Sequence, residues 1–200
     1  VVVITEPTNL GVYRGHRGRM EIEIRTQGLS CHGSAPERGI NAVYKMAAIV
    51  SDIERLNEQL AEGADPFLGK GSVTISEIRS TSPSLCAVAD SCTIHLDRRL
   101  TRGETLDSAV AQVASLPSVK AAGATVTVLY YASPAYTGLV YPARKYYPTW
   151  LMDESDPAIR AAVEAAGDAL GRPPVVGKWT FSTNGIATRG MHGVPTVGFG

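Results

Sequence analysis

The stretch LSCHGSAPERGINAV, residues 29–43, places His32 between a strand-like run and a helix-like run, among Gly, Ser and Pro. An imidazole at such a junction can bind a metal ion, donate a proton in catalysis, or make a plain structural hydrogen bond. The adjacent Cys31 does not form a Cys/His dyad with it, because consecutive residues of an extended chain point to opposite sides. The stretch by itself therefore leaves these three roles of His32 open.

Two other candidate side chains stand where strand-like runs end. Glu6 follows the apolar run VVVIT and precedes Pro7. Ligand sites of open α/β sheets lie beyond the carboxyl ends of strands, so Glu6 is a candidate metal ligand or else a solvated turn residue. In HLDRRL, alternation turns Arg98 and Arg99 to opposite faces. A planar guanidinium at a strand end suits a substrate carboxylate, although Arg99 also fits an ordinary surface position.

The turn FSTNG gathers the hydroxyls of Ser182 and Thr183 and the amide of Asn184. These groups can bind polar ligand atoms, and they equally suit plain turn chemistry. The four histidines of the chain are His16, His32, His95 and His192. They show no HxH, HxxxH or HxxE spacing, so they do not form a metal cluster by themselves.

Composition narrows the class of protein. The 200 residues, 44% hydrophobic and 19% charged, predict one globular domain, or one small domain with part of another. Lys and Arg number 19, as do Asp and Glu, which gives no electrostatic reason to expect nucleic acid or an anionic membrane. The apolar runs are shorter than a membrane span. Three cysteines without CxxC spacing argue against a disulfide framework and favour a cytoplasmic location.

Hydrophobic periodicity predicts a self-contained unit in the middle of the chain. Alternation predicts a half-buried strand over residues 18–28, and helical spacing predicts an amphipathic helix over 43–61. Strands at 71–78 and 85–100, a helix at 103–116 and a strand at 124–131 follow. This β-α-β-β-α-β order is that of a ferredoxin-like unit. Ser34 and Glu37 match a capping box for the first helix, although Gly39 favours a later start.

The two ends of the chain have α/β character. Residues 1–5 predict a strand buried on both faces. Asp156 and Pro157 fit the N-cap and first position of a helix that Gly171 closes. Directly before this helix, the Tyr- and Pro-rich stretch YTGLVYPARKYYPTWLMDES, residues 136–155, suits a linker or a docking surface.

We therefore expect residues 1–15 and 132–200 to form part of one α/β domain, which the ferredoxin-like unit of residues 16–131 interrupts. Both ends of the chain fall inside strand-like runs rather than in polar, flexible segments. This pattern indicates a piece of a longer protein.

Four stretches together resemble the metal-dependent amidohydrolase and peptidase family of acetylornithine deacetylase, succinyl-diaminopimelate desuccinylase, aminoacylase and carboxypeptidase G. They are ITEPTNLGVYRGHRGRMEIEIRTQG, CHGSAPERGINAV, HLDRRLTRGET and FSTNGIATRGMHGVPTVGFG. The motifs are similar to those of a subgroup of hydrolases linked to selenium metabolism. The resemblance implies a zinc-binding α/β catalytic domain interrupted by a ferredoxin-like lid domain, which makes a homodimer.

The resemblance also implies roles for single residues. Glu6 of TEPT matches a carboxylate ligand to one of two metal ions. His32 of CHGSAPE matches the lid histidine that reaches, often across the dimer, to polarise the scissile carbonyl. Arg99 of the DxR pattern matches a residue that holds the carboxylate of the substrate.

Ser182, Thr183 and Asn184 match the loop that contacts the substrate in this family. Many members have an Asp after the Thr, where this chain has Asn184, so the details of that contact differ. The substrate implied is a small amide or peptide, which spans acyl-amino acids, dipeptides and carbamoyl compounds across the family.

The chemistry implied is hydrolysis of a C–N amide bond by a water that bridges two zinc ions, although cobalt or manganese also suits such sites. The family's HxD motif, bridging Asp, Glu-Glu pair and last His have no counterpart in these residues. The chain alone is therefore expected to be inactive and to bind zinc weakly. The alternative is a non-catalytic module, in which the ferredoxin-like unit serves dimerisation or binding.

Overall fold

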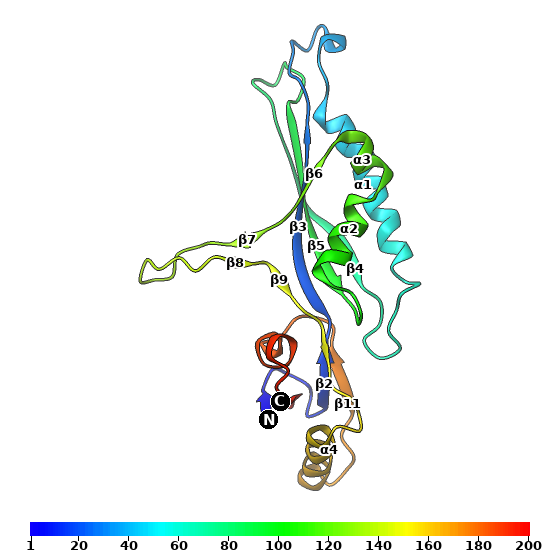
Figure 1. Ribbon diagram of the computed structural model, residues 1–200, viewed down its shortest axis with the longest axis vertical. Helices are drawn as coiled ribbons and strands as arrows, with labels where there is room; N and C mark the ends of the chain where they lie inside the picture. The colour runs from blue at the N-terminus through cyan, green and yellow to red at the C-terminus, as the bar shows by residue number, and fades with distance from the viewer.

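The computed structural model describes residues 1–200, and Figure 1 shows them as two lobes stacked along one long axis. We call the upper one in that view the ferredoxin-like lobe and the lower one the mixed-sheet lobe. The chain crosses between the two lobes twice. The first crossing lies between β2 (Val12–His16) and β3 (Gly18–Gln27), and the second lies between β9 (Tyr146–Tyr147) and β10 (Trp150–Leu151). Arg17 therefore makes the outward crossing, and Pro148 and Thr149 make the return crossing.

The ferredoxin-like lobe is an antiparallel sheet in the order β4-β5-β3-β6, with helices α1 to α3 covering one face (Figure 1). Its further elements are α1 (Ala42–Gln59), β4 (Ser72–Thr81), β5 (Ser91–Leu100), α2 (Leu106–Ala114), α3 (Pro117–Ala122) and β6 (Thr125–Val128). The expected β-α-β-β-α-β order is confirmed. The second helix is split, because Pro117 begins the separate helix α3 directly after α2.

Packing in this lobe follows the alternation seen in the sequence. Met20, Ile22 and Ile24 of β3 are fully buried beneath the helices, whereas Glu23 and Arg25 lie on the other face. The cluster around them contains 17 buried residues, against 8 in the core of the mixed-sheet lobe, so the ferredoxin-like lobe holds the larger core. Burial of apolar surface on this scale is the main force that holds the lobe together.

The expected capping box of Ser34 and Glu37 is wrong. The helix begins later, and Asn41 caps it by accepting a hydrogen bond from the Val43 N–H at 2.9 Å. Before that point the chain returns to an extended conformation, because Ile40 and Leu29 exchange two backbone hydrogen bonds. Residues 36–38 form only a short 3₁₀ turn.

The mixed-sheet lobe is built on a five-stranded sheet in the order β1-β12-β2-β10, with β11 also paired to β2. Its further elements are β1 (Val2–Ile4), α4 (Pro157–Leu170), β11 (Val176–Trp179), the π-helical turn η2 (Ile186–Met191) and β12 (Thr196–Gly198). Helix α4 is capped by Asp156 and ends at Gly171 with φ +65°, as the sequence predicts. The division into residues 1–15 with 132–200 and residues 16–131 stays a prediction.

Strand β1 was expected to be buried on both faces, and this is wrong for the chain as it stands. Val3 is 58% exposed, because β1 lies at the edge of the sheet and pairs only with β12. An arm formed by β7 (Tyr130–Tyr131) and β8 (Ala143–Arg144) projects away from both lobes (Figure 1). The Tyr- and Pro-rich stretch, residues 136–155, supplies β8 of this arm and then β9 and β10, which join the two sheets. None of the helices combines the length and the apolar run needed to cross a bilayer.

Arg98 is a charged side chain inside the core of the ferredoxin-like lobe. It faces the helices, with none of its surface exposed. Its guanidinium forms an ion pair with Glu104 and hydrogen bonds to the Gln112 Oε1 at 3.2 Å and the Arg99 carbonyl at 2.6 Å. A buried charge that is paired in this way is costly to break, because the remaining partner loses its compensation.

We predict that Arg98→Met lowers the free energy of unfolding by about 3 kcal/mol, because Glu104 then keeps a partly buried carboxylate without its cation. Urea denaturation of the 200-residue chain measures this. Arg25→Met is the matched control on the exposed face of β3, with an expected change below about 0.5 kcal/mol. Equal losses in the two variants would contradict a structural role for the buried ion pair.

Candidate functional site

Two of the candidate residues lie in one cleft of the mixed-sheet lobe. Glu6 and Asn184 face the same hollow, of about 290 Å³, which runs along the edge strand β1. Its remaining lining residues are Val2, Val3, Ile4, Thr5 and Thr188. The fold thus brings together a carboxylate and an amide that are 178 positions apart in sequence.

The turn that carries Glu6 is held from two sides. The buried Trp179 indole N–H donates to the Pro7 carbonyl at 3.2 Å. The buried Thr8 hydroxyl donates to the Gly11 carbonyl at 2.7 Å, and the Thr8 N–H donates to the Gly200 carbonyl at 2.8 Å. The Glu6 carboxylate itself makes no hydrogen bond or ion pair within the chain. A fixed turn with an uncommitted carboxylate is suited to binding a ligand.

The turn at residues 181–185 divides its polar groups between the fold and the cleft. Thr183 is buried, and its N–H donates to His16 Nδ1 at 2.8 Å. The Gly185 N–H donates to the Thr183 hydroxyl at 3.2 Å, which closes the turn. Thr183 is therefore engaged in the fold, whereas Asn184 is exposed at the cleft and Ser182 is half-buried.

His16 is a buried residue that no pattern in the sequence marks for a role. It is fully buried at the end of β2, and its Nε2 lies 3.1 Å from the Pro148 carbonyl. Burial lowers its pKa to about 4, although the bond to Pro148 acts in the opposite direction. The ring is therefore neutral near pH 7. The one signal for His16 in the sequence is its position between two strand-like runs, residues 1–5 and 18–28.

Arg99 does not line the cleft. It lies at the lower end of β5, on the sheet face opposite the helices, where it forms two bonds of 2.7 and 2.8 Å to the carboxylate of Asp97. Arg17 is nearby: burial, and then the positive charge of Arg99, lower the pKa of Arg17. The Arg17 Nε–H donates to the Thr180 carbonyl at 3.1 Å, so this pair of cations adjoins the strand that leads into the turn.

A second charged cluster lies on the same sheet face. The Glu21 carboxylate accepts hydrogen bonds from Lys145 Nζ at 2.7 Å and His95 Nε2 at 3.0 Å. Burial raises the pKa of Glu21, but the bonds from Lys145 and His95 outweigh burial and leave that pKa below its usual value. These bonds tie β3 to β5 and to the base of the projecting arm.

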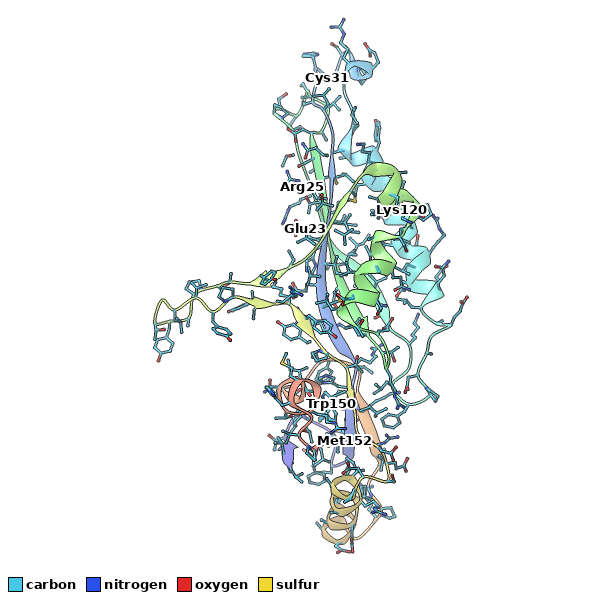
Figure 2. The ribbon with its side chains drawn as sticks, in the orientation of Figure 1. Glu23, Arg25, Cys31, Lys120, Trp150 and Met152 are labelled. Atoms are coloured by element: carbon cyan, nitrogen blue, oxygen red, sulfur yellow. The ribbon has the colours of Figure 1, made fainter.

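His32 lies at the far tip of the ferredoxin-like lobe, in the loop that Cys31 marks in Figure 2. Its Nδ1 accepts from the Ser34 N–H at 3.2 Å and from the Ser34 hydroxyl at 2.7 Å. The proton of the neutral ring is therefore on Nε2, which is exposed and makes no hydrogen bond within the chain. The loop is itself fixed, because the Gly33 N–H donates to the Cys86 carbonyl at 2.7 Å.

The tip and the cleft lie at opposite ends of the molecule. Strand β3 has ten residues, so it spans about 30 Å between the crossing and the tip. Figure 2 shows this separation between Cys31 at the tip and Trp150 and Met152 in the mixed-sheet lobe. His32 therefore cannot reach the cleft of its own chain.

The donor set of the chain does not fit a complete zinc site. No group of three or more His, Cys, Asp or Glu side chains is placed to hold one ion. A catalytic zinc ion needs about three protein ligands. Glu6 supplies a single carboxylate to the cleft, which is short of such a set.

Comparison with known proteins gives consistent results. A family model described as "Peptidase dimerisation domain" matches residues 14–125. The chain is 54% identical over 199 residues to "Uncharacterized protein YgeY" of Escherichia coli (strain K12), a match that covers 100% of this chain and 49% of that protein. It is 34% identical over 113 residues to acetylornithine deacetylase of Klebsiella pneumoniae (strain 342), over 52% of this chain and 28% of that protein.

Among solved structures, a tripeptidase from Staphylococcus aureus subsp. aureus Mu50 shares the fold, with a TM-score of 0.69 at 18% identity. That match covers 99% of this chain and 48% of the tripeptidase chain. The chain thus spans about half or less of the length of the curated relatives it matches.

His16 makes stability dependent on pH. The folded pKa of about 4 lies below the ordinary value of 6.5, so the unfolded chain binds a proton in that window and the folded chain does not. We predict that this contribution is complete above pH 6.5 and is lost as the pH falls to about 4, on the order of 3 kcal/mol in all.

Denaturant titrations at several pH values measure the effect, with His16→Asn as the reference that lacks the imidazole. The difference in unfolding free energy between the two proteins should shrink as the pH falls through this window. A difference that does not change with pH would contradict the prediction.

Proposed function

Because the chain belongs to the M20 peptidase family through its dimerisation domain, we propose that it is part of a metal-dependent hydrolase of C–N amide bonds. The type of reaction is deacylation or peptide hydrolysis, on a small amide or peptide substrate. The observation that carries this proposal is the pairing of Glu6 and Asn184 in one cleft with an exposed imidazole, His32, at the tip of the other lobe. Three free cysteines favour a cytoplasmic location.

Glu6 is proposed as one ligand of a two-zinc centre, a role that cobalt or manganese also fits. Its support is the fixed turn and the uncommitted carboxylate at the cleft. The missing ligands and the general base are proposed to come from parts of a longer polypeptide, because this chain holds no three-donor cluster.

Arg99 is proposed to bind a carboxylate of the substrate. Asp97 holds the guanidinium of Arg99 in place, and Arg17 adds a second positive charge nearby. Both arginines lie beside the strand that leads to the turn at residues 181–185. A substrate anion would bind between these cations through the N–H groups that Asp97, Thr180 and Lys70 leave free, since guanidinium–carboxylate bonds are charge-assisted. The side chains of Ser182 and Asn184 are proposed to contact its polar atoms, and Thr183 to hold the turn that presents them.

His32 is proposed to act on the substrate held by a second copy of the chain. Strand β4 lies at the edge of its sheet and pairs on one side only, with Ile78 58% exposed. Long exposed edge strands are uncommon in monomers, because their free backbone groups can pair with another chain. We therefore propose that two copies join through their β4 edges.

The direction of that pairing decides where His32 lies. β4 runs from Ser72, beside Arg99 near the crossing, to Thr81, beside Ser91 near the tip. An antiparallel β4–β4 pair with two-fold symmetry therefore sets the tip of each copy beside the lower end of its partner. In this arrangement the loop of His32 approaches the cleft of the partner subunit.

His32 is proposed to offer its free ring N–H to the scissile carbonyl. Its Nδ1 is occupied by Ser34, so Nε2–H points outward with its proton already in place. A donor aimed at the oxygen on which charge develops stabilises the transition state by about 3 kcal/mol. The proposed role is therefore hydrogen bonding to the oxyanion rather than proton abstraction.

Subunit mixing tests the exchange of His32. Full-length copies carrying Glu6→Gln and copies carrying His32→Ala are each expected to be nearly inactive. After unfolding and refolding together in equal amounts, we predict recovery of about a quarter of the wild-type activity toward N-acyl amino acids. Half of the dimers are then mixed, and one of the two sites in each mixed dimer is intact. No recovery above the separate variants would contradict a histidine supplied by the partner.

Zinc titration of the 200-residue chain tests the division of ligands. We predict no saturable binding at micromolar zinc, and no difference between the chain and Glu6→Gln, because one carboxylate does not hold the ion. Tight stoichiometric binding, with turnover of N-acyl amino acids by this chain, would show that the site is complete within it.

The second candidate function is a non-catalytic module for dimerisation or binding. It is favoured by the match to a dimerisation domain over residues 14–125 and by the incomplete donor set. The subunit-mixing experiment separates the two functions, because a module without catalysis shows no activity in the wild-type dimer either.

A further inference from the structure

One buried titratable side chain, His16, takes no part in the proposed chemistry. Its Nδ1 accepts from the Thr183 N–H at 2.8 Å, so the proton of the neutral ring lies on Nε2. The Nε2–H then donates to the Pro148 carbonyl at 3.1 Å. A single ring therefore joins the end of β2, the return crossing and the turn at residues 181–185.

The other hydrogen bonds around the two crossings do not involve residues 182–184. The Gly18 N–H donates to the Thr149 hydroxyl at 3.0 Å, which joins the outward crossing to the return crossing. Arg17 donates to the carbonyls of Trp179 at 3.3 Å and Thr180 at 3.1 Å, which precede the turn. The bonds from Thr183 to His16 are the only ones that connect residues 182–184 to either crossing.

The turn also rests on an aromatic surface. A Cβ atom at Gly185 would lie only 2.5 Å from the Trp150 Nε1, so the turn packs directly on the indole. The Trp150 and His16 rings are 5.3 Å apart, which places both beneath the same turn. Packing against the flat indole ring limits how closely the turn approaches Trp150, but it allows the turn to move parallel to the ring. A hydrogen bond also fixes the direction of the contact.

We propose that His16 is a positioning residue, which holds the main chain of residues 182–184, and with it Asn184 in the cleft, in register with both crossings to the ferredoxin-like lobe. Movement of that lobe is then transmitted to the turn through Nδ1. The consequence for catalysis rests on the proposed function, whereas the consequence for the turn does not.

Two amide variants separate the two ring nitrogens. The side-chain oxygen of His16→Asn lies near the Nδ1 position and can accept from Thr183. The longer His16→Gln places its amide near the Nε2 position and keeps the bond to Pro148 instead. The measurements are hydrogen exchange of the backbone amides of residues 182–185 and kcat/KM, both on the full-length, metal-loaded protein.

We expect His16→Asn to remain within about threefold of wild type in both measurements, because the bond to Thr183 is kept. His16→Gln is expected to exchange residues 182–185 faster, and to lose kcat/KM, by roughly tenfold or more. The exposed His192→Asn is the matched control, with neither quantity changed. Equal behaviour of the two His16 variants would overturn the proposal, because ring volume alone would then account for the residue.

The wild-type protein provides a test that does not depend on a variant folding. In a ¹⁵N-labelled sample, the proposal requires the proton on Nε2 and a coupling across the hydrogen bond between Nδ1 and the Thr183 amide. A proton on Nδ1 would overturn it. If wild type lacks amide hydrolysis but the exchange pattern holds, the proposed function fails while the positioning role stands.

Discussion

The length and stiffness of β3 set the constraint on which the rest of the structure depends. This strand lies in the centre of its sheet, hydrogen-bonded along its whole length to β5, and its apolar face is buried beneath the helices. It therefore acts as a rigid spacer of about 30 Å between His32 and the cleft. The two groups that we propose to serve one reaction are held apart in each chain, and the proposed pairing of two copies brings them together.

The two lobes are joined by short crossings, so their relative orientation depends on a few specific contacts. Arg17 alone forms the outward crossing, and its backbone and side chain both bond to the end of β11. Nearby, the ring of Phe67 in the ferredoxin-like lobe has its centroid 3.9 Å from the Arg14 guanidinium of β2. Hydrogen bonds and cation–π contacts are directional, and they suit an orientation that must be defined without a large apolar interface.

The sequence predicted those features that depend on local pattern. The strict alternation around Ile22 predicted both the strand and its buried face, and Asp156 with Gly171 predicted the ends of α4. The start of α1 was predicted within one residue, but its cap was misplaced at Ser34 instead of Asn41, because the bridge between Leu29 and Ile40 is a contact within a loop that has no periodicity. The exposure of Val3 could not be predicted either, since it depends on which strands are available to cover β1.

The candidate site shows the same limit. Glu6 and Asn184 were each plausible from their turns, but their common cleft follows from the order of strands in the mixed sheet. Thr183 was expected at the substrate, whereas the structure shows it buried and bonded to His16 inside the fold. His16 escaped notice because its importance lies in contacts to residues 132 and 167 positions away in sequence.

The central claim is that the tip of one copy meets the cleft of another, and inter-subunit cross-linking measures this directly. In the full-length protein with Cys31, Cys86 and Cys92 replaced, copies carrying His32→Cys would be refolded with copies carrying Asn184→Cys and treated with a short bis-maleimide. We predict a covalent dimer on a denaturing gel, formed only when both kinds of copy are present. Absence of that dimer from the mixed sample would contradict it.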